Sequence, residues 1–584
     1  MKLRPTPTVH SLPQQYRFRT LSEALDHASR GATGCNFYTG RGELFAVLPY
    51  AELREQALQI GSQLLGLGLS RGARIALVAE THPSFHRFFF GCQYAGLVPV
   101  AVPPPLQLGG RHSYVALLRR LLSACDAQVC IGSADIEDLM LTATRGLNLV
   151  FVGTPESFAC LPDGRQKLRP SVPRELAYIQ YTSGSTQFPR GVMITQHAVM
   201  SNVAGTIEHL RIRDGDRAVS WLPYYHDMGL VGFVLAPLAS QISVDYLGSR
   251  EFAMRPRQWL VRMSESQATI SFSPPFGYEL CARRLRCDDV RSLDLSAWRV
   301  AGIGAEPIRL EPLLRFAALA ADGGFDPAAF LPCYGLAEAS LAVTFGALNQ
   351  GLRTQWFDEQ SSHEAPPLIA IGSPHQSVGK IEPREVVNCG RPLPGHHLEI
   401  RDEVGRKLPD EHCGSIYIHG PSLMRGYIES DVTESSLLSQ DSWLDTGDLG
   451  YVQRGDVFVT GRKKDLMIIN GRNIWPQDLE RLAEQFDEVR TGDASAFSIP
   501  LDDGREQPVL VVQFRQTDYL MRGDFVKRLR QSLNRELGID CVIELVRPRT
   551  LPRTSSGKLS RSQARKDYLR RTEQQNLSML GNTA

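Results

Sequence analysis

A short loop rich in hydroxyl groups and glycine is the segment best suited to chemistry. Residues 181–192 read YTSGSTQFPRGV and follow a strand-like run at 176–181. Successive backbone N–H groups in such a loop form a nest for anions, and glycine lets the backbone approach a ligand closely. The loop is not a Walker A loop, because the G-x-x-x-x-G-K-[ST] pattern is absent. An ordinary Ser/Thr/Gly connection has the same composition, so phosphate binding and a plain turn both stay open here.

Three further motifs add an aromatic ring, two carboxylates and a lysine. In YGLAE, the ring of Tyr334 can stack on a purine and the carboxylate of Glu338 can hold Mg²⁺ beside phosphates. In TGD, Asp448 can accept hydrogen bonds from two ribose hydroxyls. Near the end, LPRTSSGKL places Lys558 on a flexible loop. Taken singly, a core tyrosine and a solvated glutamate would explain Tyr334 and Glu338 better.

The elements that must position these residues follow an α/β pattern. Short apolar runs alternate with helical patterns over most of the chain, which is typical of layered α/β proteins. Strands are expected at 73–79, 98–102, 128–131, 147–152 and 176–181, and helices at 84–97 and 196–210.

Two stretches differ from this pattern. Residues 347–385 are polar and rich in Pro and Gly, which predicts no long regular element there. After Arg462 the sequence predicts a small α+β domain of ordinary size, so we divide the chain into 1–462 and 463–584. In this second part, strands are expected at 465–469, 509–514 and 542–546 and helices at 475–486 and 524–537, with a further strand at 456–460 just before the boundary.

Composition excludes several classes of protein. The chain has 584 residues, 42% hydrophobic and 22% charged, with 64 Lys+Arg against 63 Asp+Glu. This balance argues against binding nucleic acid or anionic lipid through the charge of the whole molecule, although it is compatible with a local basic patch. The eleven cysteines contain no C-x-x-C pair, which favours reduced thiols over a zinc module or a disulfide scaffold. With no apolar leader and no apolar run of about 20 residues, we expect a soluble cytoplasmic enzyme without an integral membrane segment.

The motifs, in this order and over nearly the whole chain, resemble those of the acyl-adenylate-forming superfamily of acyl-CoA synthetases, nonribosomal-peptide adenylation domains and luciferases. Within it the chain is most similar to the fatty acyl-AMP ligases, through WLPYYHDMG at 221–229, GAEP at 304–307 and GRNIWPQDLE at 471–480. That group carries an insertion between the YGLAE and CGRP motifs. In this chain 50 residues (339–388) separate the two motifs, and we place the insertion at about 347–385. The resemblance implies a large adenylate-forming N-terminal domain with several subdomains and a small mobile α+β C-terminal domain.

The resemblance also implies ATP and Mg²⁺ as cofactors and gives individual residues roles. Lys558, His226 and Glu338 are implied as catalytic, Glu338 and Thr186 as metal ligands and Lys464 as the hinge. Gln187 and Arg190 depart from the usual glycine and lysine of the phosphate loop, although Arg keeps the positive charge. The implied nucleotide-binding residues are Thr182, Ser183, Gly184, Ser185, Thr186, Gly304, Ala305, Glu306, Tyr334, Gly335, Leu336, Asp448 and Arg462. The implied acyl-binding residues are Met228, Phe252, Phe276 and Gly302.

By this resemblance, the expected reaction converts a fatty acid and ATP to acyl-AMP and pyrophosphate. The acyl group then moves to the phosphopantetheine thiol of an acyl carrier protein, supplied by another chain, for lipid, polyketide or lipopeptide synthesis. One alternative is a long-chain acyl-CoA synthetase that uses CoA. Another is a catalytically silent acyl- or nucleotide-binding regulator, against which the presence of Lys558, Glu338 and Asp448 speaks. Nine basic residues between 547 and 571 are either a solvated helical face or a surface for an acidic carrier.

Overall fold

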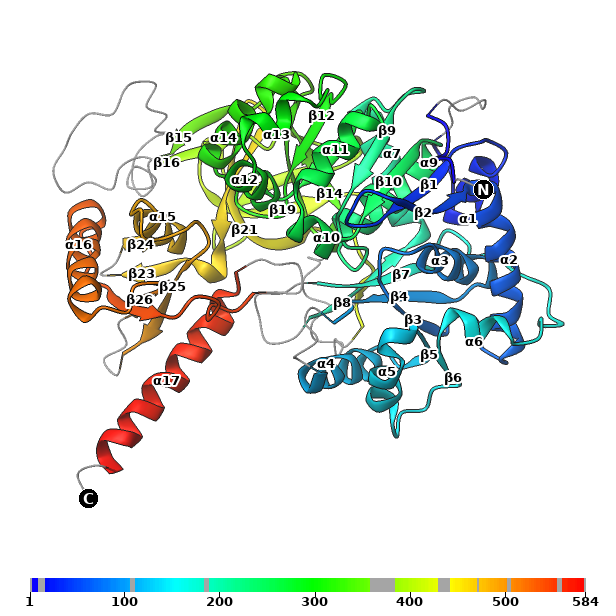
Figure 1. Cartoon of the computed structure of the whole chain (residues 1–584), viewed down its shortest axis with the longest axis horizontal. Coiled ribbons are helices and arrows are strands. Elements are labelled where there is room, and N and C mark those ends of the chain that lie inside the picture. The colour runs from blue at the N-terminus through cyan, green and yellow to red at the C-terminus, as the bar shows by residue number, and fades with distance from the viewer. Residues whose placement is uncertain are drawn as a thin grey trace.

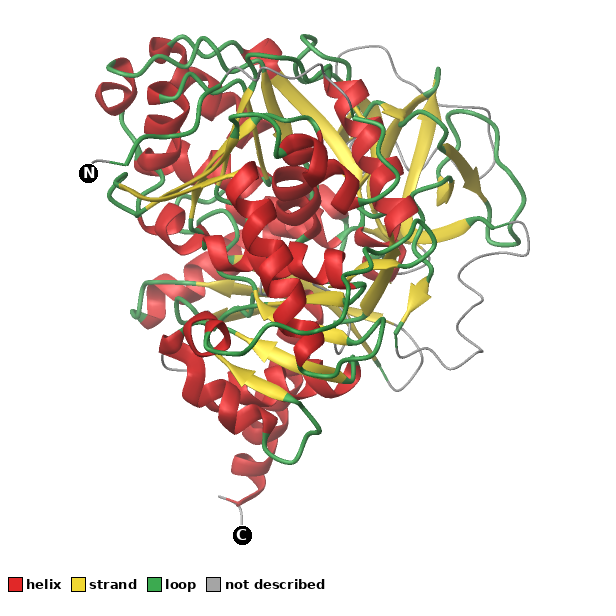
Figure 2. Ribbon diagram, turned by 90° about the vertical axis from the view of Figure 1, so that its right-hand side faces the viewer, coloured by secondary structure: helices red, strands yellow, loops and turns green. Residues whose placement is uncertain are grey.

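The computed structural model describes residues 3–8, 16–105, 111–182, 189–357, 384–428, 442–469, 472–501, 506–553 and 559–581. It shows a large N-terminal part and a smaller C-terminal part (Figure 1). Strands form sheets and helices flank them (Figure 2). The predicted α/β fold class is therefore confirmed.

The largest sheet has nine strands and is mainly parallel, with antiparallel strands at both edges. Its parallel strands are almost entirely buried, as expected of a parallel sheet covered on both faces. In spatial order the strands are β17 (Arg391–Pro392), β14 (Ala342–Phe345), β13 (Phe330–Gly335), β12 (Val300–Ile303), β11 (Ile270–Ser273), β9 (Arg217–Ser220), β10 (Ser243–Leu247), β1 (Gly34–Tyr38) and β2 (Leu44–Pro49).

A second sheet has seven strands and carries the predicted phosphate loop. Its order is β20 (Gly426–Tyr427), β8 (Gly191–Thr195), β7 (Leu176–Tyr181), β4 (Val98–Val102), β3 (Arg74–Val78), β5 (Ala127–Ile131) and β6 (Phe151–Gly153). Strands β4 and β7 have the predicted bounds. The strand predicted at 147–152 is instead the short β6, because residues before Phe151 form a turn that follows α5.

The helices of the N-terminal part lie between these strands in the chain. Helix α7 has its predicted bounds, since Thr195 caps it by accepting a hydrogen bond from the N–H of Ala198. The α-helices are α1 (Leu21–Ala28), α2 (Tyr50–Gly66), α3 (Pro83–Ala95), α4 (Arg111–Ala124), α5 (Glu137–Thr144), α6 (Pro155–Ala159), α7 (Gln196–Leu210), α8 (Asp227–Gly229), α9 (Ala236–Ala239), α10 (Ser249–Met254), α11 (Arg257–Glu265), α12 (Pro275–Arg284), α13 (Cys287–Arg291) and α14 (Leu310–Ala320).

Two smaller sheets connect the large part to the end of the chain. One contains β18 (His397–Arg401), β19 (Gly414–His419), β21 (Leu444–Gln453) and β22 (Asp456–Arg462). The other is a two-stranded antiparallel hairpin of β15 (Thr354–Phe357) and β16 (Arg384–Val387), in which Phe357 pairs with Arg384. This hairpin stem falls inside the turn-rich stretch at 347–385, and most of that stretch, 358–383, lies outside the described residues.

The C-terminal part has hydrophobic clusters of its own, formed by residues between Met467 and Ala564. Its elements are β23 (Met467–Ile469), β24 (Arg472–Ile474), α15 (Pro476–Glu484), β25 (Ala494–Pro500), β26 (Glu506–Gln513), α16 (Tyr519–Leu537), β27 (Val542–Val546) and α17 (Arg561–Gly581). Helix α16 begins five residues before the prediction because Asp518 caps it. Strand β25 was not predicted. The boundary between residues 462 and 463 remains a prediction.

Two expectations about the whole chain can be compared with the structure. All eleven cysteines are free thiols, and most are buried as expected, although Cys160 and Cys287 are exposed. Within the described ranges, no helix is both long enough and apolar enough to cross a bilayer.

Candidate active site

Two hydrogen bonds between Thr182 and Arg190 close the base of the predicted phosphate loop, next to the ends of β7 and β8. The N–H of Thr182 donates to the carbonyl oxygen of Arg190 at 3.0 Å, and the N–H of Arg190 donates to Thr182 Oγ1 at 3.3 Å. These bonds fix the two ends of the loop beside each other. Four predicted phosphate ligands lie outside the described residues, namely Ser183, Gly184, Ser185 and Thr186, as does Gln187.

Tyr334, Asp448 and Arg462 come together from three strands. Tyr334 lies near the end of β13, and its hydroxyl donates to Asp448 Oδ2 at 2.7 Å. Asp448 and Arg462 are cross-strand partners in β21 and β22, with Arg462 Nε 3.3 Å from Asp448 Oδ1. Burial raises the pKa of the Asp448 carboxyl, and the charge of Arg462 opposes that rise. The structure thus brings these three predicted nucleotide-binding residues together.

Glu338 has a partner that sequence reasoning did not find. The hydroxyl of Tyr427, on the edge strand β20, donates to Glu338 Oε1 at 2.7 Å. The guanidinium carbon of Arg190 lies 5.1 Å from the centre of the Tyr427 ring, in cation–π range. Tyr427 therefore links the base of the phosphate loop to the predicted metal ligand.

The electrostatics of Glu338 also connect it to other site residues. Burial raises the pKa of its carboxyl; the Tyr427 hydrogen bond and the charge of Arg462 oppose the rise, and the charge of Asp227 adds to it. A cation would relieve this penalty. The described residues contain no group of three or more His, Cys, Asp or Glu side chains able to hold a metal on their own. A single carboxylate such as Glu338 can supply one ligand to an ion such as Mg²⁺, which commonly takes its other ligands from substrate phosphates and water.

The GAEP motif after β12 has an unusual backbone. Ala305 has φ of +68°, in the left-handed region that non-glycine residues rarely adopt. A Cβ on Gly304 would stand 2.6 Å from Cys333 Sγ, so a larger residue does not fit there. Glu306 follows in the same turn and is partly buried. Such strained positions cluster at ligand sites.

The turn after Tyr334 also requires glycine. A Cβ on Gly335 would stand 2.0 Å from the carbonyl oxygen of Leu341. The N–H of Leu336 donates to that same oxygen at 2.9 Å. This tight turn places Glu338 four residues beyond the ring of Tyr334 and in the same site.

His226 begins α8 beside a carboxylate. Its Nδ1 lies 2.7 Å from Asp227 Oδ1, and the same carboxylate oxygen accepts the N–H of Met228 at 2.7 Å. The same Nδ1 accepts the N–H of Met228 at 3.3 Å, so the Asp227 carboxylate and the first turn of α8 together fix the orientation of the His226 ring. The side chains of His226 and Asp227 are 16% and 12% exposed, so both are accessible only in part.

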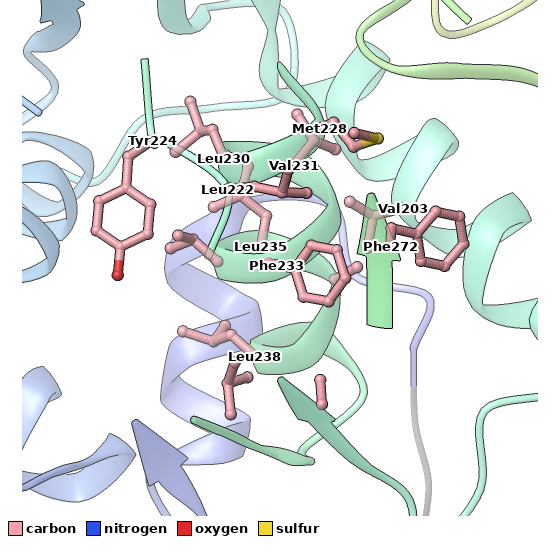
Figure 3. Packing of buried hydrophobic residues seen from close by; sticks show 14 of the residues in the cluster. Val203, Leu222, Tyr224, Met228, Leu230, Val231, Phe233, Leu235, Leu238 and Phe272 are labelled. Carbon is pink, nitrogen blue, oxygen red and sulfur yellow. The ribbon is translucent and has the colours of Figure 1, made fainter. Parts of the chain in front are cut away.

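The four predicted acyl-binding residues fall into separate packing groups. Phe252 and Phe276 both contact Trp221, with ring centres 3.9 and 5.5 Å from it. Gly302 lies against the ring of Phe272, since a Cβ there would stand 2.0 Å from that ring. Met228 is buried at the start of the helical segment 227–239, and Figure 3 shows Phe233 and Phe272 on one side of this segment.

Arg561, just after the predicted catalytic Lys558, is bonded to Asp465, the residue that follows the predicted hinge Lys464. Lys464 is exposed in a 3₁₀ turn at 463–465, where the sequence predicted a strand to begin at Asp465. Lys558 lies outside the described residues. Arg561, three residues later, forms bonds of 2.8 Å to Asp465 and to both oxygens of Glu480.

This network corrects the interpretation of the C-terminal basic run. Arg561 is partly buried between two carboxylates, and Arg571 forms a bidentate pair with Glu544. These two arginines hold the C-terminal part together and are not available to a partner. Arg561 was missed as a structural residue because its partners are 81 and 96 residues away in the chain.

Comparison with known proteins decides the family. Residues 44–428 match the model of the AMP-binding enzyme family. The chain belongs to this family. It is 42% identical over 569 residues to a Caulobacter vibrioides protein provisionally named an acyl-CoA synthetase, covering 97% of this chain and 98% of that protein. It is 31% identical over 578 residues to the medium-chain-fatty-acid–[acyl-carrier-protein] ligase JamA of Moorena producens, covering 95% of this chain and 96% of that protein.

A solved structure narrows the resemblance further. A structure from a study of fatty acyl-adenylate ligases of E. coli and L. pneumophila aligns with a TM-score of 0.89 and 44% identity. The alignment covers 96% of this chain and 100% of that one. The predicted resemblance to fatty acyl-AMP ligases, and the prediction that the chain is an AMP-binding enzyme, are confirmed.

Proposed function

We propose that this AMP-binding enzyme activates a fatty acid with ATP and then transfers the acyl group to the phosphopantetheine thiol of an acyl carrier protein. The observation that carries the first step is the joint placement of Tyr334, Asp448 and Arg462 beside Glu338. Tyr334, Asp448 and Arg462 are suited to bind adenine and ribose, and Glu338 is suited to bind a metal ion at the phosphates. Tyr427 connects Glu338 to Arg190 at one end of the 182–190 loop.

The first step joins two anions, so the site must cancel charge before bond formation. A fatty carboxylate oxygen attacks the α-phosphorus of ATP, and pyrophosphate leaves. In this proposal the backbone N–H groups of 182–186 hold the β and γ phosphates, and Asp448 accepts hydrogen bonds from the ribose hydroxyls. Lys558 donates to the carboxylate and the α-phosphate, where one such donor contributes about 3–4 kcal/mol. His226 lies where it can orient the carboxylate.

Mg²⁺ supplies charge neutralisation at the phosphates when it is bound. Glu338 and Thr186 would hold it. Tyr427 orients Glu338 by donating to Oε1, so that Oε2 is left for the ion. Arg190 keeps a positive charge at the end of the phosphate loop, where the family usually has lysine.

The choice of acyl acceptor rests on the insertion and on the relatives. In the resembled group, the insertion at about 347–385 accompanies poor use of CoA, and JamA is named for a carrier-protein acceptor. A second candidate is acyl-CoA synthesis, favoured by the name of the 42% identical Caulobacter protein. Both share the adenylation step, and they differ only in the thiol that receives the acyl group.

A product assay separates the candidates. Purified protein receives Mg²⁺, ATP and fatty acids of graded length, with either CoA or a phosphopantetheinylated carrier protein, and mass spectrometry reports acyl-AMP, acyl-CoA and acyl-carrier. We expect acyl-AMP with every active acid, and thioester only on the carrier. Efficient acyl-CoA formation would favour the second candidate, and absence of acyl-AMP with every acid would contradict both.

A variant control distinguishes the chemistry from contaminating activity. Lys558→Ala should lower acyl-AMP formation by roughly 100-fold or more, because it removes an electrostatic donor at the reacting centre. The matched control Lys527→Ala removes an exposed lysine of α16 and should leave the rate unchanged. Equal rates for both variants would contradict the assigned role of Lys558.

A further inference from the structure

An apolar tip projects from the first turn of α16. Tyr519, Leu520 and Met521 are consecutive, and their exposed fractions are 86%, 78% and 50%. Isolated exposed apolar residues are ordinary, but three in a row at one tip indicate a contact surface. Helix α16 lies at the outer edge of the C-terminal part in Figure 1, on the far side from β7 and β8.

Arginines surround this tip because two parallel strands end beside it. Strands β26 and β27 are parallel neighbours, and Gln513 pairs with Val546 at their carboxyl ends. Arg515 follows the first strand, and Arg547 and Arg549 follow the second. All three arginines are exposed.

A further arginine fixes the tip to this edge of the sheet. Arg522, in the second turn of α16, donates from Nη2 to the carbonyl oxygen of Leu545 at 2.8 Å. Its Nη1 donates to the carbonyl oxygen of Gln516 at 3.4 Å. The tip is therefore held in place beside the exposed arginines before any partner arrives.

The charge at this surface is strongly positive. Asp518 is occupied by capping α16, accepting from the N–H of Met521 at 2.9 Å. Asp524 is paired with Arg528 Nε at 2.8 Å. Among the described residues, neither Arg515 nor the two arginines after β27 have an ion-pair partner within 4 Å. The surface therefore presents arginine side chains to whatever contacts the apolar tip.

We propose that this surface docks the protein on an anionic lipid membrane. Tyr519, Leu520 and Met521 would enter the region between headgroups and acyl chains, while Arg515, Arg547 and Arg549 bind lipid phosphates. Half or more of each of the three apolar residues is exposed, which suits insertion into a lipid layer. The tip also lies away from β7 and β8. A carrier-bound thiol must reach the nucleotide site, whereas a membrane bound at the tip need not.

Vesicle sedimentation tests this proposal without ATP, fatty acid or carrier protein, so its outcome is independent of the proposed ligase activity. The full chain is mixed with phosphatidylglycerol/phosphatidylcholine vesicles or with pure phosphatidylcholine vesicles, at low and at physiological salt. The test variants are R547A/R549A and Leu520→Asp. The matched control is R565A/K566A, which removes the same charge from exposed positions on α17. Thermal unfolding and pyrophosphate exchange without vesicles check that each variant is folded.

We expect binding to the anionic vesicles that weakens with salt. R547A/R549A should weaken it roughly tenfold or more, Leu520→Asp should also weaken it, and the control should match the wild type. Absence of binding to anionic vesicles, or an equal loss in the control, would overturn the proposal. Loss of acyl transfer to a carrier by the tip variants in a vesicle-free assay, with vesicle binding unchanged, would also overturn it and assign the surface to the carrier.

Discussion

Arg309, just before α14, forms an ion pair with Glu484 at the end of α15, and this pair joins the N-terminal part of the chain to the C-terminal part. The Glu484 side chain is only 8% exposed, and its other carboxylate oxygen accepts the N–H of Gly492 at 2.7 Å. Burial raises the pKa of the Glu484 carboxyl above its ordinary value of 4.5, against the opposing charge of Arg309.

This raised pKa predicts that Glu484 makes a pH-dependent contribution to folding stability. A group whose pKa is higher in the folded than in the unfolded state favours folding most at low pH, and this contribution is lost as pH rises through the folded pKa. Wild-type protein should therefore gain stability relative to Glu484→Gln as pH falls from 7 towards 5. Thermal unfolding of both proteins across this range measures the difference. A difference that is constant with pH would contradict the prediction.

Removing the Tyr427 hydroxyl should impair adenylation more than stability. Tyr427→Phe removes a hydrogen bond to a carboxylate, which is worth about 1.5–3 kcal/mol, so we expect a loss of roughly 10- to 100-fold in kcat/KM for ATP–Mg²⁺. Pyrophosphate exchange gives the rate. Tyr94→Phe is the matched control, since Tyr94 donates to Asp26 at the same 2.7 Å outside the site. Similar kinetic losses in both variants would refute a specific role.

Asp227 should act through His226 rather than on the substrate. Asp227→Ala removes the oxygen 2.7 Å from His226 Nδ1, whereas Asp227→Asn keeps an oxygen there. We expect the alanine variant to lower kcat/KM for the fatty acid by roughly tenfold, the size of about 1.4 kcal/mol, and the asparagine variant to recover most of it. Steady-state kinetics with varied fatty acid provide the test. Equal losses in the two variants would argue against positioning through a hydrogen bond.

Asp456 should show the opposite pH trend from Glu484. Although burial tends to raise the pKa of its carboxyl, hydrogen bonds from Asn388, Arg391 and Arg353 lower it below the ordinary value. Its stabilising effect is therefore present above the unfolded pKa and is lost as pH falls through the folded pKa.

Asp456→Asn should lower the free energy of unfolding at neutral pH by about 1–3 kcal/mol. The deficit should shrink as pH falls below about 4. Denaturant unfolding of both proteins at pH 7 and at about pH 2.5 measures it. A deficit that grows on acidification would show that Asp456 is not held ionised by these partners.

Local signals predicted part of the fold well. The bounds of α7 follow from a Thr195 cap and an uninterrupted helical pattern, and β4 and β7 are short apolar runs between turn residues. The start of α16 was missed because its first turn is apolar and exposed, which hides the capping signal of Asp518. Strand β25, from Ala494 to Pro500, contains small residues that carry little strand signal of their own.

Site residues that belong to a local sequence motif were predicted. Residues recognised only through a partner far away in the chain were missed. Tyr334 and Asp448 were identified from motifs, and the structure brings them together. Tyr427 belongs to no motif, and its partner Glu338 is 89 residues away, so only the pairing of β20 with β8 places it there. Arg561 was identified only as part of a basic run, since no local sequence signal shows that it lies between two carboxylates.

The pairing of β15 with β16 makes the geometry of this sheet independent of the length of the inserted segment. Because Phe357 and Arg384 are paired, the ends of the segment between them stay adjacent whatever its length. The entropy lost on closing such a loop grows only with the logarithm of its length, by about 0.6 kcal/mol for each doubling. This segment can therefore change in length or sequence during evolution at little cost in folding free energy. Asp456, in the strand that ends at Arg462, keeps the base of the segment attached to that strand.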